Sequence, residues 1–89
     1  MKVPLLSEHR RQLLNIEEIK ASFVLTEYNG KIYISARSID EINVQIIMER
    51  LGGGGHINTA GAQFPYSDME RAIETLKKTI DIMIEEGDI

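Results

Sequence analysis

The sequence contains no cysteine, and only two of its 89 residues are proline. Without cysteine, neither a disulfide framework nor a thiolate metal site can form, which suits a cytoplasmic protein. No stretch reaches the roughly 20 apolar residues that a membrane-spanning helix needs, and the opening residues do not form a signal peptide. We therefore expect this chain to make no direct contact with a membrane.

Positive charge is also scarce. Ten Lys and Arg residues stand against fourteen Asp and Glu, which gives a net charge of −4. Proteins that bind long nucleic acids usually carry a basic stripe that neutralises phosphates, and the sequence shows none. A short nucleotide held by a few contacts remains compatible with this charge.

The length and the hydrophobic content of 43% are enough for one modest core. The sequence shows no internal repeat, low-complexity segment or long linker, so we treat residues 1–89 as a single domain. The pattern of elements predicts an α+β fold: a small mixed sheet, made of a hairpin and a third strand, packed with two to three helices.

The hairpin is the clearest local prediction. Two segments with strand-like alternation flank Asn29-Gly30, a pair that readily adopts the positive φ angles of a type I′ turn. The apolar positions of the second segment share one face of the predicted strand: Ile32, Ile34 and Ala36. Because side chains alternate along a strand, Arg37 is predicted to lie on the opposite face.

Two further segments are predicted as helices. The first begins at a Ser7 cap, and its apolar positions have imperfect helical spacing: Leu13, Leu14, Ile16 and Ile19. Residues 40–51 fit a strand by alternation, but they also show four-residue spacings, a possible Asp40 cap and a glycine stop. We predict a helix there, because it would cover the apolar face of the hairpin.

A third strand and a C-terminal helix complete the prediction. The small-residue strand covers residues 60–64 and ends at Pro65. Ser67 and Glu70 fit a capping box, and Gly87 lies where the residue after the helix belongs. The apolar stripe of this helix consists of Met69, Ala72, Ile73, Leu76, Ile80 and Met83.

Four consecutive glycines, Gly52 to Gly55, precede His56. Each glycine in regular structure costs roughly 0.5–1 kcal/mol relative to alanine, so four together indicate a local requirement. Backbone without Cβ atoms at Gly53, Gly54 and Gly55 can approach a ligand and direct N–H groups at an anion. His56 can donate to a phosphate or stack on a base. The alternative is a flexible turn followed by a polar histidine.

Arg37 is the second candidate for ligand binding, because arginine binds phosphate through a fixed fork of donors. Ser35 and Ser38 beside it could add hydroxyl donors. The alternative for a strand arginine is a surface ion pair.

The run from Gly53 to Gly61, GGGHINTAG, resembles the signature of the DHH-associated domain. That domain is the C-terminal partner of the metal-binding domain in DHH-family phosphoesterases. The longer string ISARSIDEINVQIIMERLGGGGH, residues 34–56, is similar to the version in GdpP-type cyclic di-AMP phosphodiesterases. The resemblance covers about residues 10–85, and its combined motif is highly specific.

The resemblance implies part of a hydrolase in which a separate DHH domain holds two Mn²⁺ ions and activates water for attack on phosphorus. The associated domain would hold the nucleotide, either cyclic di-AMP or a linear dinucleotide. At the matching positions Arg37 would bind a phosphate and Ser38 would assist. The backbone of Gly53, Gly54 and Gly55 would approach that phosphate, and His56 would contact phosphate or base. None of these residues would be catalytic or a metal ligand.

The sequence departs from the family pattern in two places. Ile57-Asn58-Thr59 replaces the usual Leu-Thr-Asn, which leaves any specific role of Asn58 or Thr59 in doubt. No Asp-His-His run is present, so we expect an inactive fragment whose Mn²⁺ ions belong to the upstream DHH domain of the same parent. That parent would face the cytoplasm and could be membrane-anchored. The surface that the upstream domain would cover could support a homo-oligomer.

Three alternatives stay open at this point. The same domain could come from an oligoribonuclease or an adenosine bisphosphate phosphatase of the DHH family. It could be a nucleotide-binding module without catalysis, or a purely structural or oligomerisation domain.

Overall fold

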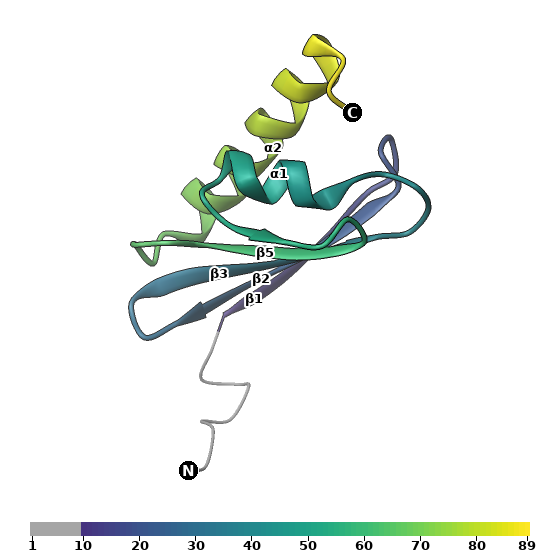
Figure 1. Ribbon diagram of the computed structural model, residues 1–89. Coiled ribbons are helices and arrows are strands. Elements are labelled where there is room, and N and C mark those ends of the chain that lie inside the picture. The colour runs from purple at the N-terminus through teal and green to yellow at the C-terminus, as the bar shows by residue number, and fades with distance from the viewer. Residues whose placement is uncertain (1–9) are drawn as a thin grey trace.

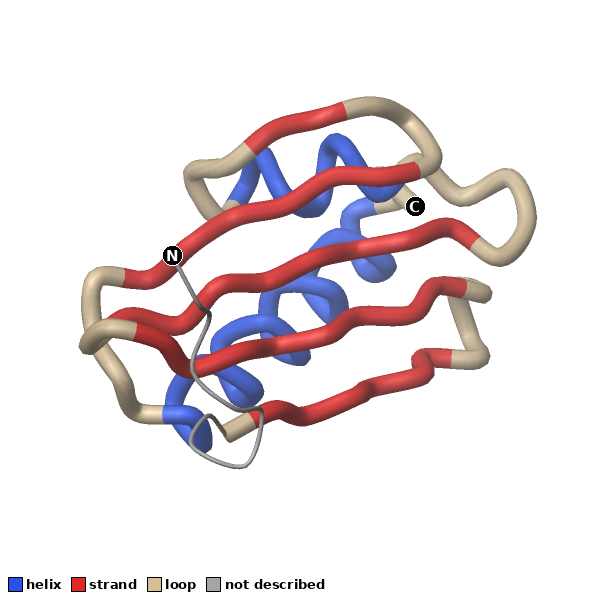
Figure 2. The backbone as a smooth tube through the Cα atoms, turned by 90° about the horizontal axis from the view of Figure 1, so that it is seen from below, coloured by secondary structure: helices blue, strands red, loops and turns tan. Residues whose placement is uncertain are grey.

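The computed structural model describes residues 10–89 of the chain. In this part, two helices cover one face of a five-stranded sheet and leave the other face open (Figures 1 and 2). The predicted α+β class is confirmed. The strands are β1 (Arg11–Ile16), β2 (Ala21–Tyr28), β3 (Lys31–Ser38), β4 (Gly54–Gly55) and β5 (Thr59–Phe64), and the helices are α1 (Val44–Arg50) and α2 (Met69–Glu86).

The sheet has the strand order β1-β2-β3-β5-β4, and each neighbouring pair is antiparallel. It differs in this detail from the mixed sheet predicted from the sequence. After β3 the chain passes through α1 and β4, and β5 then returns beside β3 in the opposite direction. The sequence of small residues in β5 gives no sign of that direction.

The predicted hairpin is formed by β2 and β3. Asn29 and Gly30 have φ angles of 54° and 78°, as a type I′ turn requires. The turn pairs Tyr28 with Lys31. The side chains of β3 alternate as predicted: those at 32, 34 and 36 are buried, whereas Arg37 is exposed on the other face.

The first predicted helix is wrong where the structure describes it, and its Ser7 cap lies outside the described residues. Leu14 and Ile16 belong to β1, where they alternate toward the core and pair with β2. The edge of β2 offers a row of hydrogen-bonding groups, and this tertiary pairing outweighs a weak helical pattern. A tight turn containing Lys20, with φ of 52°, then joins the two strands.

Helix α1 confirms the choice of a helix within residues 40–51. Its cap is Asn43 rather than Asp40. The Asn43 side-chain oxygen accepts hydrogen bonds from the backbone N–H of Gln45 at 2.9 Å and of Ile46 at 3.4 Å. Asp40 instead accepts from the Lys20 ammonium at 3.5 Å.

Helix α2 confirms the predicted C-terminal helix, with its cap shifted by one residue. Asp68, not Ser67, accepts a hydrogen bond from the Arg71 backbone N–H at 3.1 Å. The Glu70 carboxylate lies 3.8 Å from the Arg10 guanidinium and makes no capping contact within the described residues. Gly87 ends the helix in the left-handed conformation, with φ of 81°.

The core lies between the helix-covered face of the sheet and the two helices. In residues 10–89 no buried polar or charged side chain interrupts it. The largest fully buried side chains are Phe23, Leu25, Ile32, Val44, Ile47, Met48, Leu76, Ile80 and Met83. The Arg50 guanidinium of α1 donates hydrogen bonds to the carboxylates of Glu86, at 2.7 Å, and Asp88, at 2.9 Å, and so links α1 to the C-terminal end of α2. The Glu86 hydrogen bond, opposed by some desolvation, raises the pKa of Arg50.

Candidate functional site

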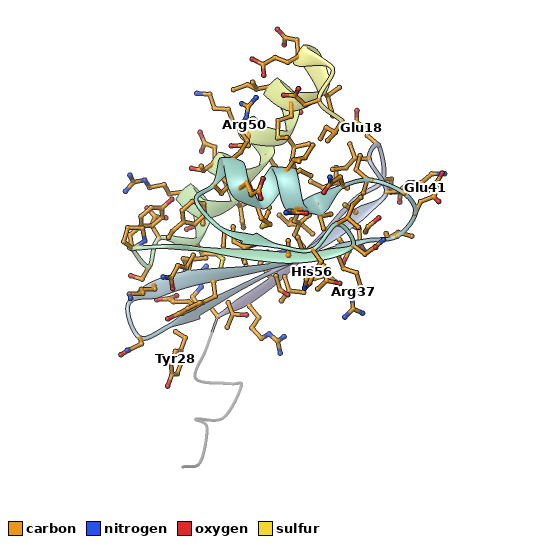
Figure 3. All side chains as sticks on the ribbon, in the orientation of Figure 1. Glu18, Tyr28, Arg37, Glu41, Arg50 and His56 are labelled. Carbon is orange, nitrogen blue, oxygen red and sulfur yellow. The ribbon has the colours of Figure 1, made fainter. Side chains whose placement is uncertain are left out.

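Arg37 lies near the end of β3 and points away from the helices, on the open face of the sheet (Figure 3). Its strand register places Ser22 of β2 on one side and Thr59 of β5 on the other. Within residues 10–89 its guanidinium has no ion-pair or hydrogen-bond partner. The surface ion pair considered for this arginine is therefore not formed in the described part of the chain.

The first residues of the glycine run terminate helix α1. Leu51 is the C-cap, and Gly52 follows it with a φ of 88°, a conformation that favours glycine. The backbone N–H of Gly53 then donates to the Met48 carbonyl at 2.8 Å. These bonds turn the chain sharply from the helix into β4.

Gly53 and Gly55 are required by the packing of β4 against β5. A Cβ atom at Gly53 would lie 2.7 Å from the Cα of Ala62 and would also clash with the Gly61 carbonyl. A Cβ atom at Gly55 would lie 2.6 Å from the Cα of Ala60, and Gly55 also has a φ of 139°. The fold itself therefore explains the absence of side chains at these two positions.

Gly54 has no such explanation. A Cβ atom placed there would meet nothing within 4 Å, and its φ lies outside the left-handed region. Gly54 pairs with Gly61, which in turn pairs with Ser35 of β3. Paired residues of antiparallel strands present their side chains to the same face, so position 54 faces the same open side as Arg37.

His56 is exposed and is joined to the Arg37 region through Thr59. The His56 backbone N–H donates to the Thr59 carbonyl at 2.7 Å, and Thr59 is the register partner of Arg37. The imidazole has no hydrogen-bond partner within residues 10–89. Figure 3 shows His56 and Arg37 at the same part of the sheet.

Ser38 is engaged in holding this region together. Its hydroxyl donates to the Asp40 carbonyl at 2.7 Å, and its backbone N–H donates to the Asn58 carbonyl at 2.9 Å. The Val44 N–H also donates to the Ile57 carbonyl, at 3.0 Å. The two backbone bonds fix the segment after β3 against the segment after β4, so they position both Arg37 and His56.

The six residues singled out in the sequence thus gather at one part of the molecule, but they have different structural tasks. Arg37 and His56 expose side chains that the fold of residues 10–89 does not use, and Gly54 leaves an open surface beside β4. Gly53, Gly55 and Ser38 shape the backbone around them. Arg37 and Gly54 lie on the same face, on strands that β5 separates, and a guanidinium and an approachable backbone are both groups that can bind a phosphate.

A family model described as the DHHA1 domain matches residues 6–81. The chain belongs to the DHHA1 domain family. The matched segment includes both Arg37 and the glycine loop, so the motif that resembles the DHH-associated domain is confirmed as part of a DHHA1 domain. This domain belongs to the DHH-family phosphoesterases.

Three curated relatives match most of the chain. The chain is 42% identical over 84 residues to "Cyclic-di-AMP phosphodiesterase GdpP" of Bacillus subtilis, covering 93% of this chain and 13% of the relative. It is 46% identical over 70 residues to "Cyclic-di-AMP phosphodiesterase PdeA" of Listeria monocytogenes, covering 78% and 11%. It is 39% identical over 84 residues to "Membrane protein-large ribosomal subunit bL9 fusion protein" of Aster yellows witches'-broom phytoplasma, covering 93% and 10%.

The chain therefore spans only about a tenth of the length of these relatives. The described part of this DHHA1 domain has no group of three or more His, Cys, Asp or Glu side chains arranged to hold a metal ion. Its helices include none that is long and apolar enough to cross a membrane.

Two neighbours of Arg37 in this DHHA1 domain were not predicted as site residues. Ser22 could have been found, because a tight turn that pairs residues 28 and 31 also pairs residues 22 and 37. The pairing of Thr59 with Arg37 depends on how β5 returns to the sheet. No local signal in the sequence sets that register.

Proposed function

We propose that this DHHA1 domain binds the phosphate of a short adenine nucleotide, and that its parent is a Mn²⁺-dependent phosphodiesterase that opens cyclic di-AMP. The observation that carries the proposal is that the Arg37 guanidinium, on the same open face as Gly54, has no partner among residues 10–89. The curated relatives from Bacillus and Listeria, whose printed names are cyclic-di-AMP phosphodiesterases, support the choice of nucleotide.

In this proposal Arg37 donates to the phosphate through its guanidinium. The backbone of the glycine loop approaches the phosphate from the β4 side, where Gly54 leaves the surface open, whereas the N–H group of Gly53 stays bonded to the Met48 carbonyl. His56 adds a contact to phosphate or base, and the Ser38 backbone N–H holds the two segments together through the Asn58 carbonyl. Each of these groups binds or orients the ligand, and none transfers a proton or attacks phosphorus.

The described residues do not offer the donor set that a Mn²⁺ site needs, because oxygen and imidazole ligands must converge on one point and no such cluster occurs there. We therefore assign the metal ions to a separate DHH domain of the parent, the partner against which this open face would close. The parent would work in the cytoplasm. The phytoplasma relative, named as a membrane protein fusion, supports a membrane-anchored parent.

Isothermal titration of the 89-residue chain with cyclic di-AMP and with linear diadenylate tests the proposal. We expect both ligands to bind. We also expect Arg37→Ala to weaken binding by about 1.5–3 kcal/mol, roughly 10- to 150-fold, as for a hydrogen bond between charged groups. Arg50→Ala is a matched control, because Arg50 is an exposed arginine whose partners are Glu86 and Asp88.

Equal affinity of the Arg37→Ala variant and the unmodified chain would contradict the proposal. Competition by adenosine bisphosphate or by longer oligoribonucleotides ranks the alternative substrates of the family. If these bind at least tenfold more tightly than either dinucleotide, the assignment to cyclic di-AMP is wrong, although the phosphate site would stand.

A further inference from the structure

The open face of the sheet carries more than Arg37. Helices α1 and α2 both lie on the other side, so the open face presents the alternate residues of β2, β3 and β5 (Figure 2). Around Arg37 these residues are small and polar: Ser22, Ser35 and Thr59. Tyr33 and Thr26, by contrast, occupy the next part of the same face, toward the hairpin turn.

The three hydroxyl groups beside Arg37 have no side-chain hydrogen-bond partner within residues 10–89. Ser22 lies directly opposite Arg37 on β2, and Thr59 lies directly opposite it on β5. Directly opposed side chains on neighbouring strands have Cβ atoms about 4.5–5.5 Å apart. Arg37 thus has hydroxyl-bearing neighbours on both adjoining strands, and the fold of residues 10–89 leaves their side chains without hydrogen-bond partners.

A shallow hollow marks the β2 side of this area. It is lined by Ser22, Val24, Ser35 and Arg37. Its wall therefore combines one cation, two hydroxyl groups and one apolar side chain. A sugar–phosphate unit presents the matching groups, since its phosphate and hydroxyl oxygens are polar and one face of the sugar is apolar.

The strand order sets the length of the ligand that could use these groups. Gly54 lies on β4, Arg37 on β3 and Ser22 on β2, and β5 separates β4 from β3. Neighbouring strands lie about 4.8 Å apart, so the three spacings across the sheet from β4 to β2 amount to about 14 Å. One phosphate group is much shorter than this distance.

We propose that the hollow at Ser22, Val24 and Ser35 is a second subsite, which holds the sugar–phosphate of the next nucleotide beyond the phosphate bound between Arg37 and the glycine loop. The inference rests on the proposed phosphate site and extends it. The first site recognises a phosphate, and the second selects dinucleotides over mononucleotides. Thr59 adds a hydroxyl on the glycine-loop side of Arg37.

The test compares linear diadenylate with AMP on the 89-residue chain carrying Ser22→Ala and Ser35→Ala together. We expect the double variant to bind diadenylate about 5- to 50-fold more weakly, as for the loss of two neutral hydrogen bonds. Its affinity for AMP should change less than twofold. Thr26→Val is the matched control, because Thr26 lies on the same face of β2 and lines neither the hollow nor the Arg37 row.

Unchanged affinity for diadenylate in the double variant would overturn the second subsite, and so would an equal loss for both ligands. If either of these results is found but Arg37→Ala still weakens the binding of diadenylate, the phosphate site stands and only the second subsite is wrong. If Arg37→Ala has no effect, or if neither ligand binds, the proposed function and the subsite are both wrong. Circular dichroism of each variant confirms that a loss of binding does not reflect a loss of folding.

Discussion

The two faces of the sheet differ in how completely the fold uses their side chains. On the helix-covered face the side chains are apolar and buried, and they pack against α1 and α2. On the open face, around Arg37, polar groups stand without partners in the described part of the chain. The first set of side chains therefore maintains the structure, whereas the second set is available for a ligand.

The glycine loop, residues 52–55, likewise contains residues that the fold requires and one that it does not. Gly53 and Gly55 cannot carry a side chain without clashing with β5, whereas Gly54 can. A glycine that the fold does not need, on the face that carries Arg37, is the best evidence in the loop for an external ligand.

The largest expected effect is a loss of stability when a large side chain is removed from the helix-covered face. Phe23 is fully buried in the centre of β2, so Phe23→Ala should lower the free energy of unfolding by about 3–5 kcal/mol through lost burial and a residual cavity. Chemical denaturation measures this loss. A decrease below about 1 kcal/mol would show that the described core does not carry the stability of the domain.

Substitutions at Gly53 and Gly54 test most clearly whether a residue serves the fold or the ligand. Gly53→Ala should destabilise the fold by about 1–3 kcal/mol, because the added methyl group overpacks β4 against β5. Gly54→Ala should change stability by no more than about 0.5 kcal/mol and should weaken nucleotide binding instead. Denaturation and titration of both variants separate the two effects. Similar stability losses in both variants would contradict the division of tasks within the loop.

A smaller effect is expected at the cap of α1. Asn43→Ala removes the acceptor for two backbone N–H groups and should cost about 1 kcal/mol of stability. Asp40→Ala is the control, since within residues 10–89 the Asp40 side chain makes only an exposed contact to Lys20, and the substitution keeps the backbone carbonyl that accepts the Ser38 hydroxyl. If the Asp40 variant proves less stable than the Asn43 variant, the assignment of the cap is wrong.

The smallest effect is expected at Arg50, which tests whether exposure alone defines a binding residue. Arg50→Gln removes exposed ion pairs with Glu86 and Asp88, and exposed pairs contribute little to stability. The melting temperature should fall less than in the Asn43→Ala variant, and nucleotide affinity should remain unchanged. A loss of affinity would place the ligand on the helices rather than on the open face.

Much of this architecture could be predicted from the sequence, because short-range chemistry determines it. The Asn29-Gly30 turn sets the hairpin and its register, and the apolar stripe of residues 69–83 sets α2. The first strand could not be predicted, because only the edge of β2 makes residues 11–16 a strand. The antiparallel return of β5 is likewise a tertiary feature.

The candidate site divides in a similar way. Arg37 and the glycine loop could be identified from residue types and from the family motif. The difference between Gly54 and its neighbours could not, since it depends on the distance between β4 and β5. The row that joins Ser22, Arg37 and Thr59 needs two strand registers, and the sequence specifies only the one set by the hairpin turn.

In the proposed function the open face of the sheet, and not the helix-covered face, binds a nucleotide phosphate. The most direct measurement is an NMR titration of the ¹⁵N-labelled chain with linear diadenylate, following the backbone signals of both faces. We expect shifts concentrated at Arg37, at residues 53–56 and at Ser22, with the signals of α2 almost unchanged. Shifts confined to α1 and α2, or no shifts at millimolar ligand, would contradict the proposed function.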